Sequence, residues 1–305
     1  MICFEDGKTI DIDLKELFND SGVKRVCLVK FDEFAGLSAK SDIKQRILAE
    51  LNNSDVSKFE SHDTFDFIRL CVPEQLARSD NARSLGVYLS KDLLFIVYIP
   101  WESHDNINET MNGILAKNPS PAKALVSLLD MFTREDSHVL QGIEEEITDV
   151  EDNLITSYKN EYIKDIIGFR KQLLPLKRYY EQLVDLFEEM DENDNEFLND
   201  SELKYCVNIS NRADRLYHIV LNLRDYVTQV REAYQSQVDI NLNVIMKVFT
   251  VITAIFLPLT LIVGWYGMNL QMPEYGWTYG YPAVIFGCVM VVVLCIVLFK
   301  KNKWF

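Results

Sequence analysis

Clustered cysteines and histidines are absent from this chain of 305 residues. Its six cysteines include no C-x-x-C pair, and its four histidines lack the spacing of metal ligands. We therefore interpret the cysteines as small core residues in a reducing compartment, and we expect neither a disulfide framework nor a zinc site. They are Cys3, Cys27, Cys71, Cys206, Cys288 and Cys295.

Motifs of enzymes and of targeting signals are also missing. There is no Gly-rich phosphate loop, no nucleophile elbow and no combination of nucleophile, base and oxyanion donor, so we expect no enzyme. The segment 1–6 has neither the basic region nor the apolar run of a signal peptide, and we expect none. Lys and Arg number 31 against 46 Asp and Glu, a net charge of −15. This charge argues against a nucleic-acid partner and suits divalent cations, although solubility alone would also explain it.

Two long apolar runs lie in the last quarter of the chain. The first, 242–266, contains one charged residue, Lys247, and the second, 281–299, contains none. Each is close to the roughly 20 residues that a helix needs to cross a bilayer. We therefore expect two membrane-spanning helices joined by a short extracytoplasmic connection, 267–280.

The charges beside these runs predict their orientation. The basic tail, 300–305, contains Lys300, Lys301 and Lys303, whereas the connection contains only Glu274 as a charged residue. Positively charged flanks stay in the cytoplasm, so both termini are expected there. The sequence thus predicts a multi-pass protein of the cytoplasmic (inner) membrane, with the lipid bilayer as a partner.

Two further regions precede the apolar runs. Residues 1–120 contain short β-branched and aromatic runs, which indicate a small sheet flanked by helices, an α/β domain. The expected strands are Val23–Phe31, Phe65–Val72, Leu85–Leu89 and Leu93–Ile99, with a hairpin turn at Ser90-Lys91-Asp92, and the expected helices are Leu14–Phe18, Ile43–Leu51 and Ala122–Phe132. Residues 121–241 are expected to form a stalk of long, charged helices. The acidic segment 188–195 is interpreted as a corner between two of them, because it lacks the Gly and the final Glu of a calcium loop.

A heptad seam extends along the last stalk helix. Its residues alternate steps of three and four, as expected of a helix that packs along a partner: Cys206, Ile209, Ala213, Leu216, Val220, Leu223, Val227, Val230 and Tyr234. No proline interrupts the chain from Ser201 until Pro258. One helix of about 65 residues, on the order of 100 Å long, could therefore continue from the stalk through the first span.

The same alternation recurs in the first span, where it gathers most of the polar side chains. We call these residues the polar stripe: Asn243, Met246, Thr250, Thr253, Leu257, Thr260 and Gly264. Polar residues in a membrane face a bundle interior or a water-filled path, whereas Thr and Gly can also serve close helix packing. Both interpretations agree if several copies enclose a pore. Met246, Phe249 and Leu257 would then form apolar constrictions that gate by dewetting.

Several short motifs resemble the CorA family of magnesium channels. They are Tyr266-Gly267-Met268-Asn269, Met272-Pro273-Glu274, Gly280-Tyr281-Pro282 and Lys300-Lys301-Asn302-Lys303-Trp304. The motif-level resemblance extends from about Ser236 to the end, and elsewhere the resemblance is one of architecture. The position of Gly-Met-Asn between two expected spans makes it far more specific than the three residues alone.

The resemblance implies a membrane α+β protein that assembles as a homopentameric funnel. The cytoplasmic α/β domain would lead into a stalk helix that continues as the pore-lining first span, with the second span around it. Gly267, Met268 and Asn269 would form the selectivity filter, where the Asn269 side chain and the Gly267 carbonyl accept hydrogen bonds from the hydration waters of Mg²⁺. Glu274 would attract cations to the outer mouth, and Lys300, Lys301 and Lys303 would form a basic collar at the inner face.

The regulatory site of the family is not recognisable in this chain. Its members are closed by Mg²⁺ bound at an acidic pair of the α/β domain and an Asp of the stalk, but the matching positions are Leu48-Ala49 and Asn208. Glu50, Asp55 and Asp214 lie nearby. We assign no sensing residue.

The transported ion and the class of protein stay open. A zinc-transporting branch, ZntB, shares the fold and Gly-Met-Asn, and Co²⁺ or Ni²⁺ could also permeate. The lack of a His or Cys cluster near the mouth favours a hard, hydrated ion such as Mg²⁺, and no other cofactor is expected. A membrane-anchored coiled-coil adaptor that conducts nothing would explain the heptad seam, but neither the polar stripe nor Gly-Met-Asn. Substitution of Asn269 distinguishes the two classes.

Overall fold

The structure is a computed structural model of the whole chain. It describes residues 1–5, 8–10, 12, 17, 22–36, 45, 47–49, 51, 56–78, 82–101, 112–114, 117, 120–156, 162–268 and 276–302. The chain divides into two compact units, Met1–Arg231 and Glu232–Phe305, and one long helix contributes to both.

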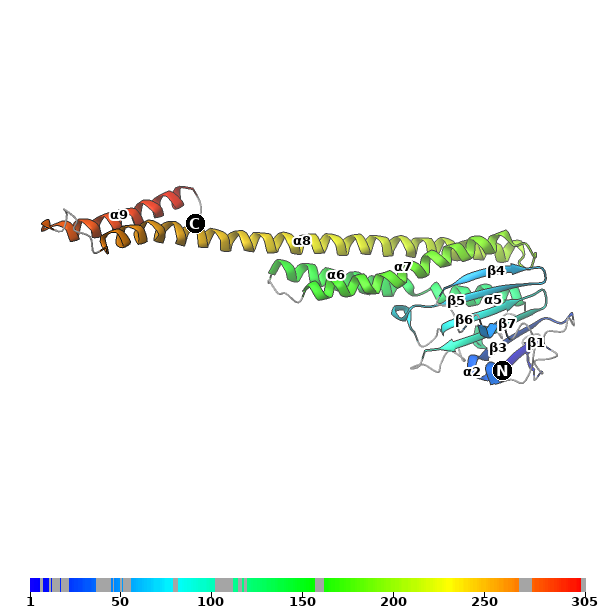
Figure 1. The fold of residues 1–305 in the computed structure, drawn as a ribbon. Helices are drawn as coiled ribbons and strands as arrows, with labels where there is room; N and C mark the ends of the chain where they lie inside the picture. Colours follow the sequence, from blue (N-terminus) through cyan, green and yellow to red (C-terminus); the bar gives the residue numbers. More distant parts are fainter. Residues whose placement is uncertain are drawn as a thin grey trace. The chain divides into compact units, whose positions relative to one another are not determined.

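The first unit is built on a seven-stranded sheet (Figure 1). The strands are β1 (Ile2–Glu5), β2 (Lys8–Ile10), β3 (Arg25–Lys30), β4 (Lys58–His62), β5 (Phe65–Cys71), β6 (Ala82–Leu89) and β7 (Leu93–Pro100), in the order β2-β1-β3-β7-β6-β5-β4. Among these neighbours only β3 and β7 pair in parallel. The expected α/β domain is confirmed. The sequence predicts β3, β5, β6 and β7, but it misses β1, β2 and β4, which are short strands at or next to the edges of the sheet.

Strands β6 and β7 form the hairpin that the sequence predicts. The Ser90 N–H donates to the Leu93 carbonyl at 2.8 Å and closes the turn at Ser90-Lys91-Asp92. All residues of β7 from Leu93 to Tyr98 are buried. A strand buried on both faces reads as a continuous apolar run, which explains why this segment lacks the alternation of a half-exposed strand.

Helices cover the sheet on both faces. One face packs with helical residues Phe34, Ile47 and Leu51, and Phe34 belongs to the short helix α2 (Phe31–Gly36). Leu51 lies so close to β6 that a Cβ added at Gly86 would be 3.2 Å from its Cδ1. Helix α5 (Pro121–Thr133) packs on β3 and β7, as expected from Ala122–Phe132. Of the other two expected helices, the structure describes only Leu17, Gln45, 47–49 and Leu51, all of them helical.

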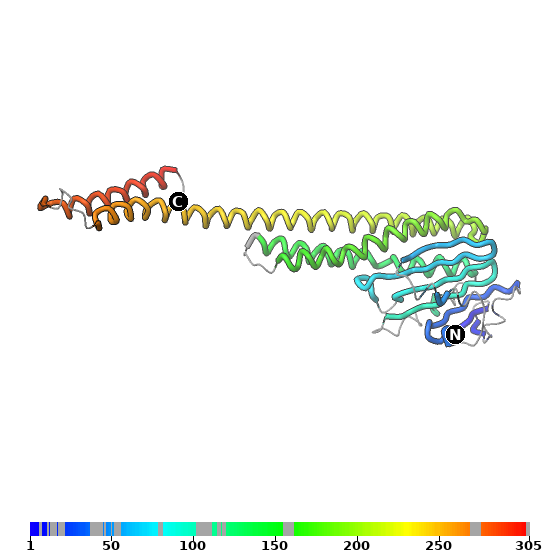
Figure 2. Tube along the Cα trace, in the orientation of Figure 1, coloured from blue at the N-terminus to red at the C-terminus, as the bar shows by residue number. Residues whose placement is uncertain are grey.

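Long helices make up the rest of the first unit. They are α6 (Asp136–Thr156), α7 (Tyr162–Glu192) and the first part of α8 (Asp200–Tyr266). The heptad seam on α8 is buried from Cys206 to Val230, whereas Tyr234 at its end is half-buried. Tyr226 of α8 donates to Glu151 of α6, and Figure 2 shows α6 and α7 alongside this part of α8. The partner of the seam therefore lies in the same chain.

The segment between α7 and α8, residues 193–199, is a helix–helix corner; the predicted corner at 188–195 overlaps it, but residues 188–192 still belong to α7. Asn193 and Glu196 have φ angles of 47° and 53°, which reverse the direction of the chain. The Asn199 side chain accepts from the Glu202 N–H at 3.1 Å, and the Glu202 carboxylate accepts from the Asn199 N–H at 3.0 Å. This reciprocal pair is a capping box that starts α8. Nearby, the Asn195 amide lies within hydrogen-bond distance of the β4–β5 hairpin and fixes the corner to the sheet.

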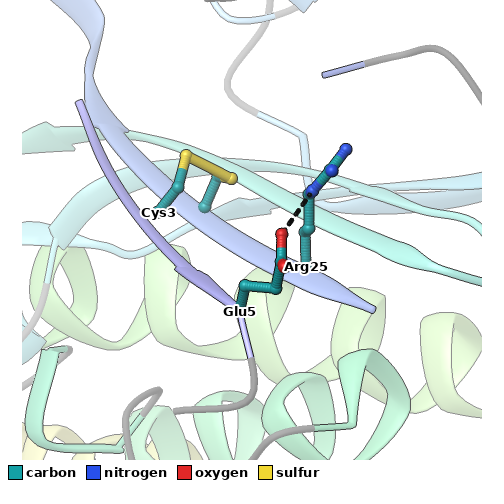
Figure 3. The surroundings of a disulfide bond; sticks show 4 residues. Cys3, Glu5 and Arg25 are labelled. Carbon is teal, nitrogen blue, oxygen red and sulfur yellow. Dashed lines mark hydrogen bonds and ion pairs between the residues drawn. A yellow bond between two sulfur atoms is a disulfide. The ribbon is translucent and has the colours of Figure 1, made fainter. Parts of the chain in front are cut away.

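The expectation of no disulfide is wrong for one pair of cysteines. Cys3 of β1 and Cys27 of β3 form a disulfide next to the Glu5–Arg25 ion pair (Figure 3). The two strands are antiparallel and their register places Cys3 directly opposite Cys27. The spacing of the cysteines could not predict this pairing, because the sequence analysis did not predict strand β1. The other four cysteines are free, as expected.

The second unit contains the rest of α8 and helix α9 (Gly280–Lys301). Both helices are long and apolar enough to cross a membrane. Helix α8 has 67 residues and continues past Pro258 to Tyr266, so the expected continuous helix is confirmed. Most of its large apolar side chains after Ile240 are exposed, including Phe249, Phe256 and Leu257, as expected of side chains that face lipid or other subunits.

Candidate functional site

The polar stripe lies on an exposed face of α8. All seven of its residues are exposed, and so is the neighbouring Phe249. Another face of the same helix is partly covered, at Val251, Ile255, Pro258 and Ile262. Cys295 of α9 contacts the Ala254 carbonyl beside these residues, at 3.8 Å. At about 100° per residue, the centre of the stripe lies roughly 140° around the helix from the centre of this partly covered face.

The threonines of the stripe present oxygen acceptors. Thr250 donates its hydroxyl proton to the Met246 carbonyl, and Thr260 donates to the Phe256 carbonyl, each at 2.8 Å. Because a hydroxyl has one proton and two lone pairs, each oxygen keeps acceptor capacity after this bond. Acceptors of this kind can bind the protons of water that hydrates a cation.

Helix α8 ends at the Gly-Met-Asn motif. The Gly267 N–H donates to the Val263 carbonyl at 2.8 Å, and the Met268 N–H donates to the Trp265 carbonyl at 3.3 Å. A Cβ at Gly267 would lie 3.0 Å from the Val263 oxygen, so a larger residue could fit this close turn only if the backbone shifted slightly. The carbonyl end of a helix carries partial negative charge, which favours a cation.

Other expected residues of the mouth and tail are only partly described. Asn269, Glu274 and Lys303 lie outside the described residues. Lys300 and Lys301 occupy the last turn of α9, where positive charge interacts favourably with the helix dipole.

The positions at which the resemblance would place a regulatory site carry no acidic residue in this chain. Leu48 is half-buried against the core, Ala49 is exposed, and Asn208 is exposed on α8. Asp214 lies 3.6 Å from His218, one turn further along the same helix. Glu50 and Asp55 lie outside the described residues. In the described part of the chain, no three His, Cys, Asp or Glu side chains gather as a metal site.

A cleft of about 1030 Å³ lies beside Asn208, between α5, the start of α8 and residues Gly113, Ile114 and Lys117. Its central acid, Asp130, forms ion pairs with Arg212 and Arg134. Burial acts to raise the pKa of Asp130, but hydrogen bonds and charges from the two arginines outweigh it and hold this pKa below its ordinary value. The charges of Asp130 and these two arginines therefore compensate one another, and we assign the cleft no ligand.

The structure also joins polar residues that sequence reasoning does not bring together. Asp136 accepts from Arg78 and Tyr180, and Asp66 accepts from Asn195. The partners are 44 to 129 residues apart in the chain, so no local pattern could have revealed them.

Comparisons with known proteins agree with this arrangement. The sequence profile of the family described as "CorA-like Mg2+ transporter protein" matches residues 29–301. The "Cobalt/magnesium transport protein CorA" of Thermotoga maritima is 25% identical over 319 residues, which cover 99% of this chain and 89% of the relative.

Two solved structures share the fold. The CorA magnesium transporter from Methanocaldococcus jannaschii matches with a TM-score of 0.80 at 23% identity, over 100% of this chain and 98% of that one. The ZntB cytoplasmic domain from Vibrio parahaemolyticus matches with a TM-score of 0.58 at 13% identity, over 78% and 98%. Because the family profile covers most of its length, this chain belongs to the CorA family and is a membrane transporter of divalent cations, not an enzyme.

Proposed function

We propose that this protein carries Mg²⁺ into the cell through a pore that several copies of the chain enclose. The observation that carries the proposal is the polar stripe, which lies exposed on the side of α8 away from α9. Polar side chains within a membrane span are costly in lipid. A second copy of the same stripe across a water-filled path would remove that cost.

The ion would enter in hydrated form at Gly267, Met268 and Asn269. Mg²⁺ gives up its water shell reluctantly, so a ring of neutral oxygens can select the hydrated ion by hydrogen bonds to its waters. A neutral ring also avoids trapping the ion, which conduction requires. Glu274 would concentrate cations at the mouth.

Below the ring, the polar stripe would line the path. Asn243, Thr250, Thr253 and Thr260 would offer acceptors to the hydration shell, and Gly264 would leave room for it. Met246, Phe249 and Leu257 would form narrow apolar rings that close by excluding water. Lys300, Lys301 and Lys303 would surround the inner end as a basic collar.

The proposed arrangement is a homopentamer in the inner membrane, with both termini in the cytoplasm. A closed ring of one chain is a common form of symmetric assembly, and it makes every copy contribute the same face to the axis. Under this arrangement residues 1–120 form the cytoplasmic α/β domain, 121–241 the stalk, 242–266 and 281–299 the spans, and 267–280 the outer connection. The orientation is supported by the basic tail and the single acid of the connection.

A zinc transporter of the same fold is the second candidate. The shared fold with the ZntB cytoplasmic domain favours it, and Co²⁺ is a further candidate because it is named in the Thermotoga maritima relative. The absence of His and Cys from 264–281 favours the harder Mg²⁺ ion.

Ion flux into proteoliposomes tests the proposal. Purified protein is reconstituted, and uptake of Mg²⁺, Zn²⁺ and Co²⁺ is compared for the wild type, Asn269→Ala and the control Thr278→Ala. Thr278 lies in the same connection and is exposed. We expect Mg²⁺ uptake in the wild type and the control, and its loss in Asn269→Ala.

Other outcomes separate the alternatives. Uptake of Zn²⁺ without Mg²⁺ would favour the zinc transporter. Folded, oligomeric protein that moves none of the three ions would contradict transport and favour the adaptor.

A further inference from the structure

One face of α7 combines exposed apolar and basic side chains. We call this face the basic stripe: Ile167, Arg170, Lys171, Leu174 and Arg178. Steps of three and four residues place them on one side of the helix, away from its buried residues. The apolar members are well exposed, Ile167 at 46% and Leu174 at 43%. In the part of the chain that the structure describes, the three basic members form no ion pair.

The adjacent helix α6 has an exposed face of the opposite charge. This helix contains no Lys or Arg. We call its outward-facing residues the acidic stripe: Gln141, Glu145, Asp149 and Asp152, all of them exposed. Gln141 donates to Glu145 at 3.1 Å within the stripe. Because the basic stripe forms no ion pair among the described residues, the two stripes do not neutralise each other there by direct contact.

The two stripes point to different sides of the molecule. Helix α6 contacts α8 through Glu151, which accepts from Tyr226. Helix α7 contacts α8 through Lys177, whose Nζ lies 5.5 Å from the centre of the Tyr217 ring. In a group of three helices that pack on one another, the outward faces of two of them point in different directions. One copy of the chain therefore presents a basic side and an acidic side.

The charges of the two stripes lie at the same height along the helices. Tyr180 of α7 donates to Asp136 of α6 at 3.0 Å, which places these two residues side by side. The helices follow each other in the chain and run in opposite directions (Figure 1). Glu145 follows Asp136 by nine residues and Lys171 precedes Tyr180 by nine, so their heights agree within about one helical turn.

We propose that the basic stripe of each copy docks on the acidic stripe of the next copy in the ring. This inference rests on the proposed pore, because a ring of three or more copies joins two different surfaces of each chain. If the ring axis lies along the helices, rotation moves one copy onto the next without changing its height. Lys171 then faces Glu145 of the neighbouring copy, and Ile167 and Leu174 lose exposed apolar surface.

The contact sets the arrangement of neighbouring copies more than the strength of their assembly. Exposed ion pairs add little to stability, because water and salt screen them. Complementary charges nevertheless fix the register of a contact and disfavour other arrangements. Docking of the two stripes therefore aligns neighbouring copies at the height of α6 and α7, outside the proposed ion path.

Cysteine cross-linking between differently tagged chains tests the contact. Full-length Lys171→Cys with one tag and Glu145→Cys with another are co-expressed, reconstituted into proteoliposomes and oxidised with diamide. We expect a disulfide-linked dimer that carries both tags and disappears on reduction. In the matched control Glu146→Cys replaces Glu145→Cys. Glu146 is also exposed but lies about 100° around α6, so the control should lose this product.

A second pair of positions tests the role of charge. Asp149 lies thirteen residues after Asp136 and Ile167 thirteen before Tyr180, so Asp149→Cys and Ile167→Cys chains should also cross-link. When both chains also carry Lys171→Glu, the yield of this product should fall. When Glu145→Lys is added to both as well, the opposite charges are restored and the yield should recover. A yield that Lys171→Glu leaves unchanged would overturn docking by charge.

The oligomeric state separates this proposal from the proposed pore. Folded, oligomeric protein that gives no two-tag product with either pair would overturn the contact. A control that cross-links as much as Glu145→Cys would do the same. In both cases ion uptake still tests the pore by itself. Monomeric protein in the membrane would overturn the contact and the pore together.

Discussion

Single polar side chains hold the helices of this protein to its sheet. Asn195 lies 2.7 Å from the Asp66 carboxylate, 2.7 Å from the His62 carbonyl and 3.0 Å from the Ser61 hydroxyl. Burial raises the pKa of Asp66, while the hydrogen bonds from Asn195 and Ser61 act in the opposite direction. A buried acceptor that loses its donor costs about 1–3 kcal/mol, so such residues affect stability more than their small number implies.

The disulfide predicts the number of free thiols in the chain. The chain has six cysteines, of which Cys3 and Cys27 are bonded and four are free. Denatured, unreduced protein should therefore take up four alkylating groups per chain, and six after reduction, as measured by intact mass. Cys3→Ser together with Cys27→Ser is the control, and it should take up four under both conditions. Six groups without reduction would show that the pair is reduced.

Residue-scale features differ in how far sequence could predict them. The capping box of Asn199 and Glu202 is local, three residues apart, and its pattern is visible in the chain. The Cys3–Cys27, Arg78–Asp136 and Asn195–Asp66 contacts depend on strand register and helix docking, which join distant segments. The scattered cysteines argue against a disulfide framework, but composition contains no information on one cross-strand pair.

Helix α8 has two distinct faces along its length. Continuing the seam from Val230 in steps of four and three leads to Val251, Ile255 and Pro258, the face that α9 contacts. The helices of its own chain therefore cover one face of α8 in both units. The polar stripe belongs to another face, which the described part of the chain leaves exposed. The two faces are offset around the helix axis. The same alternation of three- and four-residue steps therefore describes both the buried seam and the exposed polar stripe.

The seam makes a prediction at the scale of the helix. Leu216 is 3% exposed at its centre, so Leu216→Ala should lower the free energy of unfolding by about 2–5 kcal/mol through lost burial and a residual cavity. Val207 is on the same helix but 43% exposed, and Val207→Ala should change this free energy by less than about 0.5 kcal/mol. Denaturant titration of the full-length variants, followed by circular dichroism through the unfolding transition of the first unit, compares their free energies of unfolding. Equal effects would contradict the intramolecular seam.

At the scale of the whole molecule, sequence predicted the fold class but not the sheet order. Apolar runs of known length and the lack of proline between Ser201 and Pro258 were enough to predict two long apolar helices and the continuous helix α8. Strands β3 and β7 pair in parallel, and more than 60 residues separate them in the chain. The sequence pattern of each strand does not reveal which distant strand it pairs with. The site was predicted from the Gly267-Met268-Asn269 motif. Asn269 lies outside the described residues, so the role of its side chain in selecting the ion belongs to the proposal.

A shared pore can be tested by mixing subunits. Wild-type and Asn269→Ala chains are co-expressed at several ratios, purified together through one tag that both carry and reconstituted, after the pure variant has been shown to fold, assemble and lose Mg²⁺ uptake. If five copies share one path and one altered copy closes it, an equal mixture assembled at random retains about 3% of wild-type flux, whereas independent copies retain about 50%.

The shape of the whole curve is more informative than one ratio. A fall that follows the fifth power of the wild-type fraction supports the pentamer, and another power gives the number of copies that share the path. Thr278→Ala chains mixed in the same way should leave uptake unchanged, since their exposed side chain lies outside the proposed ring. A linear decline would contradict a common pore, and the exposed polar stripe of α8 would then need a different partner within the membrane.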